Sequence, residues 1–152
     1  MTKLLCLGAA IAMGLAALAN GLVMLAAPQG WYHSVPGVTT TGPFNQHFIR
    51  DIGLIFLLVG GSFMTGVVRP HLRIALWAAP TLWLSGHAFF HLWEVAEGIS
   101  AHSAVARDFP AVTLPALLGI ALTFWAWDDR SETATSLLGR QGSVISRDHQ
   151  PG

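Results

Sequence analysis

Four long apolar stretches limit the folds that this chain can adopt. They cover approximately residues 4–27, 48–68, 74–96 and 109–127. A helix that crosses the hydrocarbon core of a bilayer, which is roughly 30 Å thick, needs about 20 mainly apolar residues. In lipid, a single span can satisfy its own backbone hydrogen bonds only as a helix. The sequence therefore predicts an all-α integral membrane protein in which residues 1–127 form a four-helix bundle.

The composition agrees with a membrane protein. Hydrophobic residues make up 53% of the chain and charged residues only 11%, whereas about a quarter of a soluble domain is charged. The net charge is zero and basic residues do not cluster, so we expect the lipid bilayer and no nucleic acid as a partner. Cys6 is the only cysteine, which leaves no internal disulfide and no cysteine-based metal motif.

Basic residues predict the orientation of the spans, because cytoplasmic loops carry an excess of Lys and Arg. One side of the predicted bundle holds Lys3, Arg69, Arg73, Arg130, Arg140 and Arg147. The other side holds Arg50 and Arg107. We therefore expect an N-in, C-in topology, with the RPHLR turn in the cytoplasm and the loops at 28–46 and 98–108 facing outward.

The two ends of the chain need separate interpretation. The first apolar stretch has 24 residues, whereas the core of a signal peptide usually has about 7–15. We predict a retained span, with cleavage near ALAN as the alternative. Residues 128–152 are polar and rich in Ser, Gly and Arg, and we expect them to form a disordered cytoplasmic tail.

Ionisable side chains gather toward the outer side of this topology. In HAFFHLWE, His87, His91 and Glu94 fall within about 60° on one face of the third span. In NQHFIRD, His47 and Asp51 share a face at the start of the second span. Helices joined by a short turn are expected to be antiparallel neighbours. The sequence therefore predicts that these five side chains converge near the outer surface.

A converging set of imidazoles and carboxylates is typical of a transition-metal site, because Zn, Fe, Mn and Cu accept these ligands. We expect such a site to serve metal handling or a redox step. Three alternatives stay open. The groups can be interhelical hydrogen bonds in a non-enzymatic protein that supports or assembles a membrane complex. His47 with His87 or His91 can ligate a haem from facing helices. A proton or small-molecule pathway is the third alternative. The sequence contains no phosphate loop, CxxC, GxSxG or HExxH motif.

Other residues predict local packing. Asn45 is the expected N-cap of the second span. Small residues on the first two spans predict close helix packing, at Gly8, Ala12, Ala16, Ala10, Gly14, Ala17, Gly21, Gly60 and Gly61. Aromatic residues are expected to anchor the bundle at the membrane surfaces, with Trp31, Tyr32 and Trp93 at the outer one and Trp77, Trp125 and Trp127 at the inner one.

The layout resembles the DoxX-like group of small bacterial four-helix membrane proteins. The resemblance rests on the first span ending in LAAP, the outer loop, NQHFIRDIG at the start of a Gly-containing second span, and a short Arg-containing turn. It covers residues 4–127 and implies a bacterial inner-membrane protein. Separately, we expect a second copy of the chain or a membrane complex as partner. Some members are associated with redox or quinone-linked processes. The His-rich NQHFIRD and HAFFHLWE segments are not a pattern of that group.

Overall fold

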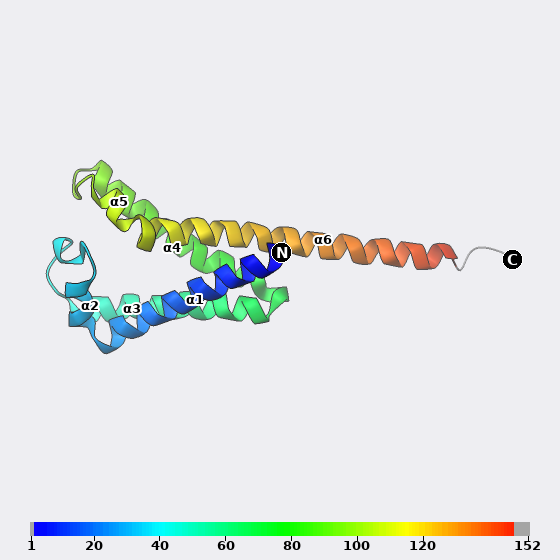
Figure 1. The fold of residues 1–152 in the computed structure, drawn as a ribbon, viewed down its shortest axis with the longest axis horizontal. Coiled ribbons are helices and arrows are strands. Elements are labelled where there is room, and N and C mark those ends of the chain that lie inside the picture. The colour runs from blue at the N-terminus through cyan, green and yellow to red at the C-terminus, as the bar shows by residue number, and fades with distance from the viewer. Residues whose placement is uncertain (1, 148–152) are drawn as a thin grey trace.

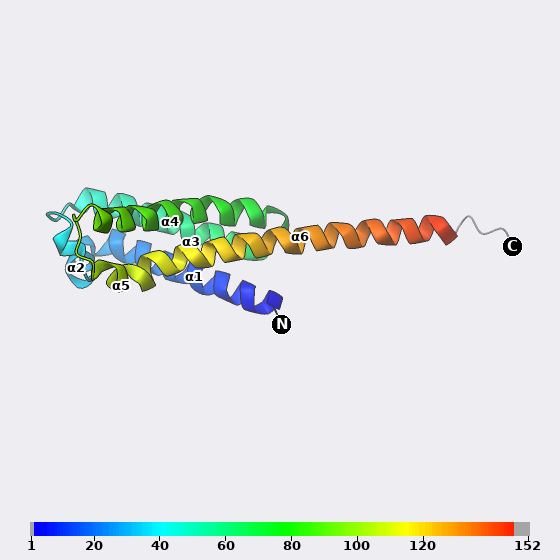
Figure 2. The ribbon, with the colours of Figure 1, turned by 90° about the horizontal axis from the view of Figure 1, so that it is seen from above.

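The computed structural model describes the backbone of residues 2–147 and the side chains of residues 2–131. Within residues 2–147 the elements are helices and helical turns, with no β-strand, so the all-α prediction is confirmed. Four long helices lie side by side: α1 (Thr2–Ala26), α3 (Gln46–Val68), α4 (Arg73–Ala96) and α6 (Leu114–Arg147). Figures 1 and 2 show that α6 continues well beyond the ends of the other three.

Short elements join the long helices at two ends of the molecule. The loop end holds α2 (Pro28–Ser34), η1 (Val38–Thr40), α5 (Ala104–Asp108) and the π-helical turn η3 (Phe109–Thr113). The turn end holds η2 (Pro70–Leu72), which joins α3 to α4. Proline occupies the first position of α2 and of η2, where its missing N–H has no partner to lose. Asn45 caps α3 as predicted, because its side chain accepts a hydrogen bond from the Phe48 amide at 3.1 Å.

Three of the predicted spans coincide with long helices to within two residues: α1, α3 and α4. Among the described residues, three helical segments are apolar enough by length and composition to cross a membrane, namely Thr2–Ala26, Gln46–Val68 and Ala104–Ser131. The 24-residue α4 is outside this set. Its histidines and Pro80 lower its mean hydropathy, so membrane insertion of α4 depends on how its polar side chains are accommodated.

The fourth helical segment is longer than the predicted 109–127. The chain is already helical from Ala104, changes to a π-helical turn at Phe109, and continues as α6 to Arg147. Pro110 lies in this turn, and a proline removes a regular backbone hydrogen bond. The tail predicted to be disordered, residues 128–152, overlaps this helix as far as Arg147, and its disorder stays a prediction. Residues 128–147 contain no proline that would stop a helix. Residues 148–152 lie outside the described part of the chain.

Two glycine pairs bring α1 and α3 into close contact. A Cβ on Gly21 would lie 2.7 Å from the carbonyl oxygen of Gly53, and one on Gly60 would lie 2.6 Å from that of Gly14. Both distances are too short for a real side chain, so the two backbones touch at these levels. The predicted faces containing Gly14 and Gly21 therefore pack against α3. Gly8, in contrast, has open space beside it.

A buried arginine links the helices at the turn end. Arg73 is only 4% exposed and packs against the adjacent rings of Trp77 and Trp125, each with its centroid 5.4 Å from the guanidinium carbon. Its Nε donates to the carbonyl oxygen of Gly66 at 3.0 Å, and its Nη1 donates to Asp129 Oδ2 at 3.3 Å. Trp77, which we expected at the membrane surface, is instead fully buried, with its Nε1 donating to the Phe63 carbonyl oxygen at 3.1 Å.

Candidate functional site

The five side chains predicted to form one site do not gather at one point. His47 Nε2 lies 3.2 Å from Asp51 Oδ2 on α3, and both side chains are largely exposed. Among the residues whose side chains are described, no three His, Cys, Asp or Glu groups are close enough to hold a metal ion. The α3 pair and the α4 histidines therefore form no such group within residues 2–131, and the five-residue metal site stays a prediction.

The reason is the face that α3 presents to its neighbours. The buried face of α3 includes Ile49 and Gly53, and Gly53 meets α1. Asp51 is two positions from both Ile49 and Gly53, and His47 is two positions from Ile49. Two positions correspond to about 200° around a helix, so both polar residues lie opposite the buried face. The glycine contact with α1 thus turns both polar side chains away from the bundle.

His91 finds a different partner, which the sequence analysis did not identify. Its Nδ1 lies 3.1 Å from Oδ2 of Asp108, and both side chains are mostly buried. Arg107 donates to the same carboxylate through Nε at 2.6 Å to Oδ1 and through Nη2 at 3.0 Å to Oδ2. Both oxygens of Asp108 are therefore engaged. We refer to His87, His91, Arg107 and Asp108 as the loop-end network.

Local structure brings Asp108 to His91. Gly98 has a left-handed conformation, with φ of +72°, and the backbone amide of Ile99 donates to the Glu94 carbonyl oxygen at 2.9 Å, so α4 ends here. The chain then reverses, and α5 packs back against α4. A glycine after the last helical turn is the usual residue at such a reversal, because it adopts a positive φ without steric cost.

The loop at residues 35–45 also contacts the loop-end network. Gly37 has φ of +86°, and a Cβ at this position would overlap the guanidinium group of Arg107. Only glycine satisfies both conditions without strain. Arg107 is therefore held between the backbone of the 35–45 loop and the Asp108 carboxylate, which connects this loop to α5 and α4.

His87 lies between an aromatic column and His91. Its ring stacks on Trp83 with centroids 5.3 Å apart and planes 9° apart, and Trp83 meets Phe56 of α3 edge-on at 5.5 Å. The rings of His87 and His91 are 4.7 Å apart in a T-shaped arrangement. Glu94 is half-buried, and within residues 2–131 no contact joins its carboxylate to either histidine.

Further hydrogen bonds hold the loop after α1 in place and join α1 to α3. Trp31 Nε1 donates to Asn20 Oδ1 at 2.9 Å, and the Tyr32 hydroxyl donates to the Gly42 carbonyl oxygen at 2.7 Å. Arg50 Nε donates to the Leu25 carbonyl oxygen at 3.2 Å. Asn20, the one strongly polar residue of the first apolar stretch, is thus a partner for the loop. His33 and His102 are exposed.

Chemically, the loop-end network orients one imidazole. An ionised carboxylate only accepts hydrogen bonds, so an ionised Asp108 accepts its hydrogen bond from Nδ1 of His91. A signal for Asp108 was present in the sequence. The dipeptide Arg-Asp occurs at residues 50–51, 107–108 and 147–148, and the first two lie near the start of a long helical segment at the loop end.

Comparisons of the chain with protein-family models, curated proteins and solved structures gave no match. The resemblance to the DoxX-like group therefore stays a prediction, and the function is argued from the geometry alone.

Proposed function

We propose that this chain is a non-enzymatic integral membrane protein that supports or assembles a membrane complex, and that its histidines and carboxylates hold its own helices and loops together. The observation that carries this proposal is the loop-end network. His91, Asp108 and Arg107 form consecutive pairwise contacts that end on the backbone of Gly37. Contacts of this kind join helices and need no bound group.

The turn end supports the same interpretation. Arg73 connects the end of α3 with Asp129 of α6, and Lys3 of α1 lies 3.6 Å from the same carboxylate. Polar contacts thus tie the long helices at both ends, while glycine pairs pack α1 on α3. A rigid unit of this kind suits a protein whose role is to present a fixed surface to other membrane components.

We further propose that all four long helices cross the bilayer as a bundle, with the turn end in the cytoplasm. The three apolar segments support insertion. For α4, His91 reaches a carboxylate partner and His87 an aromatic one, so its polar groups are directed toward protein. Intramembrane polar groups are tolerated when they face the bundle interior or pair with one another.

Cysteine labelling tests this topology, because Cys6 is the only native cysteine. In a Cys6→Ala background, single cysteines replace the exposed Thr40, His71 and Ala101. A membrane-impermeant maleimide applied to spheroplasts should label positions 40 and 101 directly, and position 71 only after permeabilisation. If position 101 instead behaves like position 71, α4 does not cross the membrane and the four-span proposal is wrong.

Variants of the loop-end network test the supporting role. His91→Gln keeps a side chain that can donate to Asp108, whereas His91→Ala does not. We expect His91→Ala to lower the free energy of unfolding by about 1 kcal/mol, with most of this recovered in His91→Gln. A loss of bound metal without a change in stability would contradict the proposal.

A transition-metal site is the second candidate function, and one observation favours it. A metal-binding histidine usually donates its other ring N–H to a carboxylate, and Asp108 holds His91 in this way beside the His87 ring. Zn, Fe, Mn or Cu bound by these two imidazoles would take its remaining ligands from solvent or from a small molecule.

Elemental analysis of gently purified, detergent-solubilised protein separates the two candidates. A stoichiometric metal that is lost in the His87→Ala/His91→Ala variant but retained in His47→Ala would establish the metal site. The His47→Ala control is matched because His47 is paired with Asp51 on α3, outside the loop-end network.

A further inference from the structure

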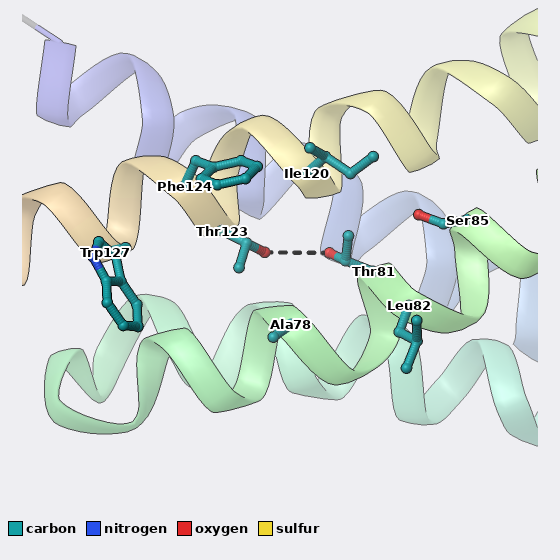
Figure 3. A pocket seen from close by; sticks show the side chains of 8 residues that line it. All are labelled: Ala78, Thr81, Leu82, Ser85, Ile120, Thr123, Phe124 and Trp127. Carbon is teal, nitrogen blue, oxygen red and sulfur yellow. Dashed lines mark hydrogen bonds between the residues drawn. The ribbon is translucent and has the colours of Figure 1, made fainter.

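A groove runs between α4 and α6 in the middle of the molecule (Figure 3). It has a volume of about 540 Å³ and is open on one side. Its lining comes from Ala78, Thr81, Leu82 and Ser85 of α4 and from Ile120, Thr123, Phe124 and Trp127 of α6. The loop-end network contributes nothing to it, so the groove is a separate feature of the fold.

The groove is apolar although it contains hydroxyl groups. Thr81 and Thr123 point toward each other across its floor, with their hydroxyl oxygens 3.4 Å apart (Figure 3). The Thr123 hydroxyl also donates to the Gly119 carbonyl oxygen at 2.8 Å. Gly119 permits the close approach at the floor, since a Cβ there would lie 2.6 Å from the Thr81 hydroxyl oxygen. The threonine hydroxyls are thus bound within the protein, and methyl groups and rings form most of the remaining surface.

The size of the groove limits what can occupy it. Along α4 the groove extends from Ala78 to Ser85. These seven steps of the helix correspond to about 10 Å, or about a third of the hydrocarbon thickness of a bilayer. A hydrocarbon chain one methylene wide is narrow enough to lie along a groove of this size.

We propose that this groove binds one acyl chain of a phospholipid from the leaflet at the turn end. This inference rests on the proposed membrane insertion, because only then does the groove open toward hydrocarbon. The exposed side chains of Leu82, Phe124 and Trp127 form its rim. Trp127 lies toward the turn end, and Arg130 follows it by one helical turn. Arg130 is placed to contact the phosphate of the lipid whose chain lies in the groove.

Photo-crosslinking tests this proposal. The purified full chain is reconstituted in phosphatidylethanolamine vesicles containing phosphatidylglycerol with a diazirine in the middle of one acyl chain, and labelled peptides are mapped. We expect labelling concentrated at residues 78–85 and 120–127. Ala78→Phe and, separately, Ser85→Phe fill the groove from its two ends, and each should abolish this labelling. Ala12→Phe adds the same side chain on an exposed face of α1 and should leave it unchanged.

Three results would overturn the proposal. Labelling spread evenly over the exposed faces of all helices means that the groove has no preference for a chain. Retention of the groove label in both folded phenylalanine variants means that the label lies elsewhere. A protein crosslinked at the groove in place of lipid means that a partner occupies it. Alkaline extraction before labelling identifies a failure of membrane insertion itself, because a protein that is not inserted is released from the vesicles.

Discussion

Arg73 offers the most direct test of how the helices are held together, through the variant Arg73→Met. Methionine keeps an unbranched apolar side chain but removes the guanidinium group that packs against Trp77 and Trp125. Arg69→Met is the matched control, because Arg69 lies in the same turn and is exposed. The comparison therefore isolates the buried contacts of the guanidinium group from the general loss of a positive charge.

The magnitude follows from the contacts that are lost. A hydrogen bond from a charged donor, such as that to the Gly66 carbonyl oxygen at 3.0 Å, contributes about 1.5–3 kcal/mol. A desolvated cation–π contact contributes about 2 kcal/mol. Asp129 keeps Lys3 at 3.6 Å, so its carboxylate is not left without a cation. We expect Arg73→Met to lower the free energy of unfolding by about 3–5 kcal/mol in total, within the range for a broken buried pair.

Unfolding in mixed detergent micelles, titrated with dodecyl sulfate and followed by tryptophan fluorescence, measures this change. Trp77 and Trp125 report on it directly because both rings contact Arg73. The free energy of unfolding of Arg73→Lys should lie between that of the unchanged protein and that of Arg73→Met. An ammonium group keeps the charge but lacks the planar arrangement of donors that a guanidinium group has. If Arg73→Met and Arg69→Met are equally stable within about 1 kcal/mol, the buried contacts do not hold the turn end together.

Three further predictions use the same unfolding assay. Gly21→Ala should lower the free energy of unfolding by about 1–3 kcal/mol through overpacking, whereas Gly8→Ala should leave it unchanged because a Cβ there meets open space. Equal effects of the two variants would refute the close contact of α1 with α3. Gly37→Ala should lower the free energy of unfolding by about 1–2 kcal/mol, because alanine is strained at the positive φ of this position. It should also speed amide hydrogen exchange in the 35–45 loop, because the added Cβ displaces Arg107. Unchanged exchange would argue against the contact between Gly37 and Arg107. His47→Ala should cost less than about 1 kcal/mol, because its pair with Asp51 is exposed, and a larger loss would show that His47 is buried by a partner.

Several features of the fold were predictable because they depend on short-range properties of the chain. The lengths of the apolar stretches determine α1, α3 and α4 to within two residues. Asn45 supplies a hydrogen-bond acceptor where the amides of α3 begin, and a short turn requires α3 and α4 to be neighbours. Each inference uses residues that are close in sequence, so no knowledge of the distant packing is needed.

The candidate site was only half predictable. Spacing alone places His87 and His91 on one face of α4, and the structure has their rings in contact. The partner of His91 is 17 residues away, beyond a chain reversal at Gly98. The position of Asp108 depends on how α5 packs on α4, and a periodic pattern within α4 contains no information about it.

The sequence by itself determined that this chain forms long apolar helices and which residues share a face of each one. Only the tertiary structure decided which face meets a neighbour. Gly21 and Gly53 press α1 against α3, and this contact sets the rotation of α3 and turns His47 outward. Helical periodicity is unchanged by such a rotation, because it describes angles between residues of one helix. The direction of a face depends instead on contacts between side chains that are distant in the sequence.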